Sequence, residues 1–233
     1  MEFQSRAYRR ASVALLSVLF LTLLSSLPAR AAEKLRLHVD DYQIDAELIP
    51  HTHHLTARAK VKFTALDDTN IASFELHNAL RVTKVLDEAG KTLTAERFTQ
   101  DSTVRVQLPK GLAKNASTTL TFEYEGTLDS ADESPVQGLK LASIGDETSY
   151  LLYAGRWFPV NGYGLNRFTA TINVTVPVHM IAIGSGKQTT STASALKKAA
   201  ASDGPTKTFS FVWDKPSFPG TIVAGAFQEF KTD

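Results

Sequence analysis

The 233-residue sequence contains no cysteine. Disulfide bonds are therefore excluded, and so is the cysteine-linked lipid that anchors a bacterial lipoprotein. Without covalent cross-links the chain has to bury a self-sufficient hydrophobic core, and a domain of about 200 residues is large enough to do so. We expect one independently stable domain.

An excess of charge of either sign is also absent. The chain has 25 lysines and arginines against 24 aspartates and glutamates, with both signs interspersed along its length. A nucleic-acid binder needs a basic stripe or patch, and the sequence shows none. We expect no nucleic-acid partner.

Residues 1–31 have the order of a secretory signal peptide. Arginines precede an apolar run over 11–27, and Ala29 and Ala31 supply the small side chains needed at positions −3 and −1 of a cleavage site. This order predicts cleavage after Ala31 and an exported mature chain, 32–233, in the periplasm or outside the cell. An uncleaved anchor is the alternative, because the run is close to the shortest that spans a bilayer. No later apolar stretch is long enough to cross a membrane.

Catalytic motifs are missing as well. The sequence contains no His-Glu-x-x-His, which would present two zinc-binding imidazoles on a helix, and no Gly-x-Ser-x-Gly or phosphate-binding glycine loop. The Gly-x-Gly at Gly184-Ser185-Gly186 opens onto a threonine-rich stretch rather than a helix, which argues against a dinucleotide site there. The sequence predicts no catalytic residue in this chain.

Four histidines are the only candidates for a metal site. His51, His53 and His54 follow Pro50, and His38 lies upstream. Two imidazoles from one extended segment could share a metal ion. A polar turn between two strands is the simpler explanation, because a zinc site also needs further ligands with support behind them.

Alternation of apolar and polar residues dominates the rest of the chain. It is clearest over 42–48 and 55–63, which predict a β-hairpin. The fold class that we expect is all-β, an antiparallel β-sandwich or saddle of about a dozen short strands. Two polar stretches, 129–147 and 189–205, predict exposed irregular segments. The further predicted strands cover 72–77, 81–86, 92–98, 103–108, 118–124, 149–153, 168–176, 181–183, 207–213 and 221–230.

Several segments follow one another in an order that resembles a known domain. They are residues 42–66 (YQIDAELIPHTHHLTARAKVKFTAL), 74–93 (FELHNALRVTKVLDEAGKTL), 150–160 (YLLYAGRWFPV), 168–187 (FTATINVTVPVHMIAIGSGK) and 211–230 (FVWDKPSFPGTIVAGAFQEF). Their series is similar to the successive strands of the N-terminal domain of the aminopeptidase N family of zinc metallopeptidases. The resemblance covers nearly all of the chain after the leader.

The resemblance implies a domain that does no chemistry by itself. In that family, the N-terminal β-domain packs against a catalytic domain that supplies the zinc ligands and a Gly-x-Met-Glu-Asn substrate anchor. Neither motif occurs here, so zinc and a peptide substrate are implied only through a catalytic domain that this sequence lacks. We expect a fragment or truncated form that exposes one apolar face and does not hydrolyse peptides alone. A stand-alone periplasmic binding or adaptor module is the alternative.

One loop of the family's N-terminal domain contributes an acidic residue to the substrate pocket. Alignment on Phe158 and Pro159 places Tyr150 at that position, with Glu147 three residues earlier. The resemblance therefore implies Glu147, Tyr150 and Tyr153 as candidates for the pocket. For both tyrosines, packing in a core-facing aromatic strand is the other interpretation.

Overall fold

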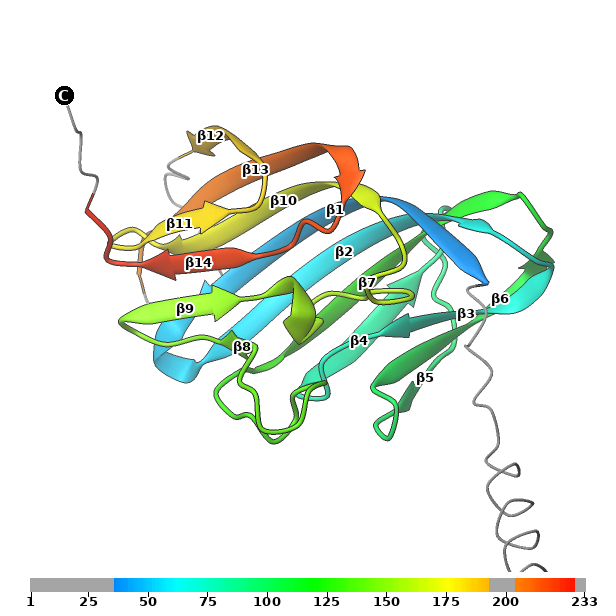
Figure 1. Cartoon of the computed structure of the whole chain (residues 1–233), viewed down its shortest axis with the longest axis horizontal. Coiled ribbons are helices and arrows are strands. Elements are labelled where there is room, and N and C mark those ends of the chain that lie inside the picture. Colours follow the sequence, from blue (N-terminus) through cyan, green and yellow to red (C-terminus); the bar gives the residue numbers. More distant parts are fainter. Residues whose placement is uncertain (1–35, 193–203, 229–233) are drawn as a thin grey trace, which may run out of the picture. The chain divides into compact units, whose positions relative to one another are not determined.

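The computed structural model describes residues 36–192 and 204–228, and most of these residues lie in β-strands (Figure 1). The predicted signal peptide, with Ala29 and Ala31, lies outside the described residues. The strands are β1 (Leu37–Ile49), β2 (His54–Ala65), β3 (Thr69–Glu75), β4 (Leu80–Leu86), β5 (Ala95–Phe98), β6 (Thr103–Leu112), β7 (Ser117–Thr127), β8 (Ala142–Ser143), β9 (Thr148–Leu151), β10 (Phe168–Pro177), β11 (Ile181–Gly184), β12 (Lys187–Thr192), β13 (Thr206–Ser217) and β14 (Ile222–Gly225). The expected all-β fold class is confirmed.

The described residues form three sheets. The largest has seven strands in the order β12-β13-β10-β1-β2-β7-β4, and the others have the orders β11-β14-β9-β8 and β3-β6-β5. Two short 3-10 turns, η1 (Pro50–Thr52) and η2 (Tyr153–Gly155), connect strands. No helix in the described part of the chain is both long and apolar enough to cross a membrane.

The predicted hairpin is confirmed and is longer than the sequence pattern indicated. β1 and β2 pair from Ile49 opposite His54 to Leu37 opposite Ala65. Along β2 the side chains alternate strictly between buried and solvent-facing, as a strand with one covered face requires. This hairpin forms the centre of the large sheet.

One pair of strands departs from the expected antiparallel arrangement. β1 and β10 are parallel, with Ile44 opposite Ile172, whereas the other strand pairs are antiparallel. Parallel neighbours need a long connection, because the chain has to return to the end of the sheet at which the first strand began. Here the intervening chain builds the whole three-stranded sheet and half of the four-stranded sheet before β10 returns.

The core lies between the large sheet and the two smaller sheets. Phe74 of β3 meets Phe63 of β2 and Phe122 of β7 edge-on, with ring centroids 5.6 and 5.1 Å apart. On the other side, Tyr42 of β1 contacts Phe158, which precedes β10 in the chain, at 5.1 Å. One face of the large sheet is therefore covered, and its other face carries the polar side chains.

The two predicted interruptions differ in outcome. Between 129 and 147 the chain is irregular apart from the two residues of β8, as predicted. Thr189–Thr192, however, belong to the edge strand β12, which pairs with β13. Threonine favours an extended backbone, so this polar stretch continues the sheet. Residues 193–203 of the second interruption lie outside the described residues.

Candidate functional site

Tyr153 lies in an aromatic cluster at the margin of the core. It begins η2, and its ring stacks on that of Tyr163, with centroids 5.1 Å apart. Phe158, Phe168 and Phe218 surround it at about 6 Å. Burial raises the pKa of the Tyr153 hydroxyl to about 12, so this group stays neutral at physiological pH. The ring packs as a core-facing aromatic, and its stacked partner Tyr163 is 40% exposed.

An ion pair fixes the segment around this cluster. The guanidinium of Arg156 lies 2.9 Å from the carboxylate of Glu75 on β3 and stacks over the ring of Tyr163. The second Glu75 oxygen accepts a hydrogen bond from the Tyr163 backbone N–H at 3.4 Å. Arg156 itself has φ of +50°, a backbone conformation that ordinary residues rarely adopt. No local sequence pattern indicated the pairing of Arg156 with Glu75, because the two residues lie in distant parts of the chain.

Tyr150 lies apart from Tyr153, on the solvent side of the four-stranded sheet. Register aligns Tyr150 of β9, Val223 of β14 and Ile183 of β11 in one row across three strands. Ile183 is 59% exposed, and the Tyr150 hydroxyl donates a hydrogen bond to the Lys140 carbonyl at 3.1 Å. We call Tyr150, Val223 and Ile183 the apolar row. Ile183 is the exposed member of this row, whereas Tyr150 and Val223 are half-buried. Apolar surface that stays exposed on a folded domain is a common feature of contact surfaces.

The three predicted pocket residues are therefore not brought together. Glu147 is exposed in the turn just before β9, Tyr150 stands on the outer side of its sheet, and Tyr153 is buried. Among the described residues, no hydrogen bond or ring contact joins any two of them. Glu147 and Tyr150 therefore lie on the solvent-facing side of the four-stranded sheet, whereas Tyr153 lies in the core.

The histidines do not form a metal site in the described part of the chain. Nδ1 of His53 is hydrogen-bonded to the Ile144 carbonyl oxygen at 2.6 Å, and Nδ1 of His38 is hydrogen-bonded to Oδ1 of Asn166 at 3.0 Å. No group of three or more histidines and carboxylates among the described residues lies close enough to hold a metal ion. The residues present here do not fit the zinc that the resemblance implies, so no step through zinc is assigned to this chain.

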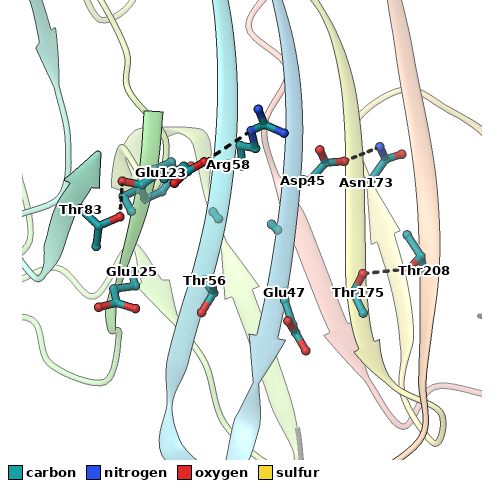
Figure 2. A pocket seen from close by; sticks show the side chains of 13 residues that line it. Asp45, Glu47, Thr56, Arg58, Thr83, Glu123, Glu125, Asn173, Thr175 and Thr208 are labelled. Atoms are coloured by element: carbon teal, nitrogen blue, oxygen red, sulfur yellow. Dashed lines mark hydrogen bonds and ion pairs between the residues drawn. The ribbon is translucent and has the colours of Figure 1, made fainter. Parts of the chain in front are cut away.

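The polar face of the seven-stranded sheet contains a shallow hollow of about 590 Å³. Figure 2 shows that its side chains come from adjacent strands of this sheet. Of its lining residues, the charged or polar ones are Asp45, Glu47, Thr56, Arg58, Thr83, Glu123, Glu125, Asn173, Thr175 and Thr208. Four of these side chains are carboxylates and one is an arginine, so the hollow is electronegative.

Most carboxylates of the hollow have partners. Asp45 accepts a hydrogen bond from the Asn173 side-chain amide at 2.8 Å. Glu123 lies 3.9 Å from the Arg58 guanidinium, and Glu125 is paired with the neighbouring Arg81. These contacts leave one carboxylate of the hollow to be accounted for.

That carboxylate is Glu47 of β1. It is half-buried, and its Oε1 atom is inaccessible to solvent and accepts no hydrogen bond from any described residue. Burial raises the pKa of Glu47 above its usual value, because the charged form loses hydration without gaining a partner. Sequence reasoning missed this residue, since an outward-facing glutamate in an alternating strand looks ordinary.

A Glu47→Gln variant should be more stable than the natural chain at pH 7. A carboxylate whose pKa is raised by folding stabilises the fold only below its unfolded pKa, and this contribution is lost as pH rises through the folded value. Glutamine removes the charge and keeps the shape, so the gain should be present at pH 7 and absent at pH 4. Urea unfolding at both pH values measures it. Glu96→Gln, at an exposed carboxylate on β5, is the control and should change stability by less than about 0.5 kcal/mol.

No protein-family model matches the sequence, and no curated protein matches it. Solved structures do. An M1 zinc metallopeptidase from Deinococcus radiodurans aligns with 81% of this chain at 22% identity and a TM-score of 0.67. A substitution variant of that enzyme, bound to a Tyr-Ser-Ala substrate, aligns with 80% of the chain at 23% identity and a TM-score of 0.65. A two-domain M1 zinc metallopeptidase variant bound to L-tryptophan aligns with 82% at 22% identity and a TM-score of 0.67.

In each case the match covers only part of the solved chain. The chain spans 42 or 43% of the length of these solved chains. The similarity thus concerns one part of a larger protein, which agrees with a resemblance to a single domain. The chain has the fold of the matched part of M1 zinc metallopeptidases.

Proposed function

We propose that this chain is the non-catalytic N-terminal β-domain of an exported zinc aminopeptidase, an enzyme that removes N-terminal amino acids from peptides. The shared fold with M1 zinc metallopeptidases is the observation that carries the proposal. The absence of any catalytic motif from the sequence, and of any metal-binding group from its described residues, supports a role without chemistry of its own. The signal-like leader supports export.

The role of such a domain is to brace a catalytic domain and to help wall the cavity that admits a peptide. The apolar row on the four-stranded sheet is the surface that suits this role, since a partner that covers the exposed Ile183 side chain removes apolar area from water and so stabilises the contact. Glu147 and Tyr150 lie at the same sheet. The proposal therefore places Glu147 and Tyr150 at the border with the catalytic domain, where they would face the peptide, and Tyr153 behind them.

An Ile183→Asp variant tests this surface. The proposal requires that the same genome encode a catalytic segment with a His-Glu-x-x-His motif, in frame or in a separate gene, and this segment is the partner in the test. The purified chain alone, supplied with zinc, should not hydrolyse aminoacyl anilides. Mixed with the catalytic segment it should bind and raise turnover, and Ile183→Asp should weaken that binding by about tenfold or more, the usual cost of losing a central apolar contact.

The matched control is Ile71→Asp, at an exposed isoleucine on β3 of the three-stranded sheet. Both variants should retain the β-sheet circular dichroism of the natural chain. Turnover by the chain alone would contradict the proposal, and so would equal loss of binding in both variants. A stand-alone binding or adaptor module is the second candidate, favoured by the hollow on the large sheet. If the genome encodes no such catalytic segment, the stand-alone module is the better explanation.

A further inference from the structure

We propose that the hollow on the polar face of the seven-stranded sheet binds small linear diamines, with Glu47 as the principal contact. The hollow measures about 590 Å³, which is in the range of small-molecule sites, about 300 to 1,000 Å³. It lies on the face of the large sheet opposite the core, and the function proposed above does not use it. The inference therefore stands independently of that function.

The state of Glu47 is the first reason for this inference. A half-buried carboxylate normally has a cation or several hydrogen-bond donors beside it, because an unpaired buried charge is costly. Glu123 and Glu125 follow this rule through Arg58 and Arg81, and the exposed Asp45 has one amide donor, from Asn173. Glu47 has no partner among the described residues, and its raised pKa reflects that cost. A bound cation would supply the missing partner.

The neighbours of Glu47 indicate which cation fits. Register places Thr56 of β2 on one side of Glu47 and Thr175 of β10 on the other. Figure 2 shows these two threonines on the strands that flank Glu47. A primary ammonium carries three N–H donors, and the carboxylate and the Thr56 hydroxyl offer acceptors for them. The Thr175 hydroxyl is hydrogen-bonded to that of Thr208 at 2.8 Å, and its oxygen has a second lone pair that can accept. No group of three metal ligands exists among the described residues, so a divalent metal ion suits the hollow less well.

The second amine of the ligand is implied by Asp45. This residue stands two positions before Glu47 on the same strand and the same face, about 7 Å away along a β-strand. Its carboxylate accepts one hydrogen bond, from a neutral amide, and keeps further acceptor positions. A flexible four-carbon diamine can place its two ammonium groups near both carboxylates. A monoamine reaches only one of them.

Calorimetric titration of the full chain with 1,4-diaminobutane at low salt tests the proposal. Glu47→Gln should weaken binding about tenfold, the effect of losing one well-placed charge contact, and Asp45→Asn should weaken it less. Glu96→Gln, outside the hollow, should leave affinity unchanged. Nuclear magnetic resonance of the glutamate side chains gives a second readout. Saturation with diamine should lower the pKa of Glu47, because the bound cation favours the ionised form.

Three results would overturn the proposal. Binding that is the same in Glu47→Gln and the natural chain would remove the central contact. Magnesium chloride that binds as tightly as the diamine would show a diffuse attraction for cations. Equal affinity for 1-butylamine and 1,4-diaminobutane would exclude the second contact. Circular dichroism of each variant separates loss of binding from loss of fold, and none of these outcomes bears on the role beside a catalytic domain.

Discussion

A Trp157→Ala variant should lose about 3 to 5 kcal/mol of unfolding free energy, the usual cost of removing a fully buried large aromatic. Trp157 is 0% exposed, and its ring meets that of Phe158 edge-on at 5.0 Å. Its indole N–H donates to the Gly220 carbonyl at 2.6 Å, which leaves an unpaired buried acceptor when the ring is removed. Urea unfolding followed by circular dichroism measures the loss.

Trp213 provides the matched control for this prediction. It is half-buried on β13, and its indole N–H has no hydrogen-bond partner among the described residues. Trp213→Ala removes the same atoms but less buried contact, so it should cost clearly less than Trp157→Ala. Equal losses in the two variants would contradict the central position assigned to Trp157.

The domain should lose about 3 kcal/mol of stability as pH falls from 6.5 to 4, through one histidine. His77 is 1% exposed, and burial, with a further contribution from the charge of Arg97, lowers its pKa from 6.5 to about 4. Its Nδ1 accepts a hydrogen bond from the Ala79 backbone N–H at 3.2 Å, an arrangement that requires the neutral ring. Between the two pKa values the unfolded chain binds one more proton, so acid favours unfolding.

The difference between the natural chain and a His77→Gln variant isolates this effect. Carboxylates also change protonation at low pH, but they do so in both proteins. The stability of His77→Gln should fall much less between pH 6.5 and 4, measured by urea unfolding at several pH values. His179→Gln, at an exposed turn, should keep the full dependence. A persistent slope in His77→Gln would show that another group is responsible.

The strands of this fold could be read from the sequence because their information is local. In β2, alternate residues from Leu55 to Ala65 face the core, and this period of two is visible without a structure. The burial of Tyr153 among aromatics was one of two interpretations that the sequence left open. Apolar alternation thus predicts which residues are inside.

Local patterns do not predict which strands become neighbours. The parallel pairing of β1 with β10 joins residues such as Asp45 and Asn173, which are 128 positions apart. The ion pair of Glu75 with Arg156 has the same origin, since each residue alone resembles any exposed charge. Glu47 was missed for a related reason. Its lack of a partner is a property of three adjacent strands, and the sequence of β1 carries no sign of it.

The central parallel pair also constrains how the protein is made. When the chain emerges with its N-terminus first, β1 can pair with β2, β2 with β7 and β7 with β4, but the other side of β1 has no neighbour until β10 has emerged. Contacts between distant segments form slowly, and an unpaired strand edge is open to association with other chains. The nascent domain therefore passes through a stage with the middle of its largest sheet unprotected, ended only by the arrival of residues 168–177.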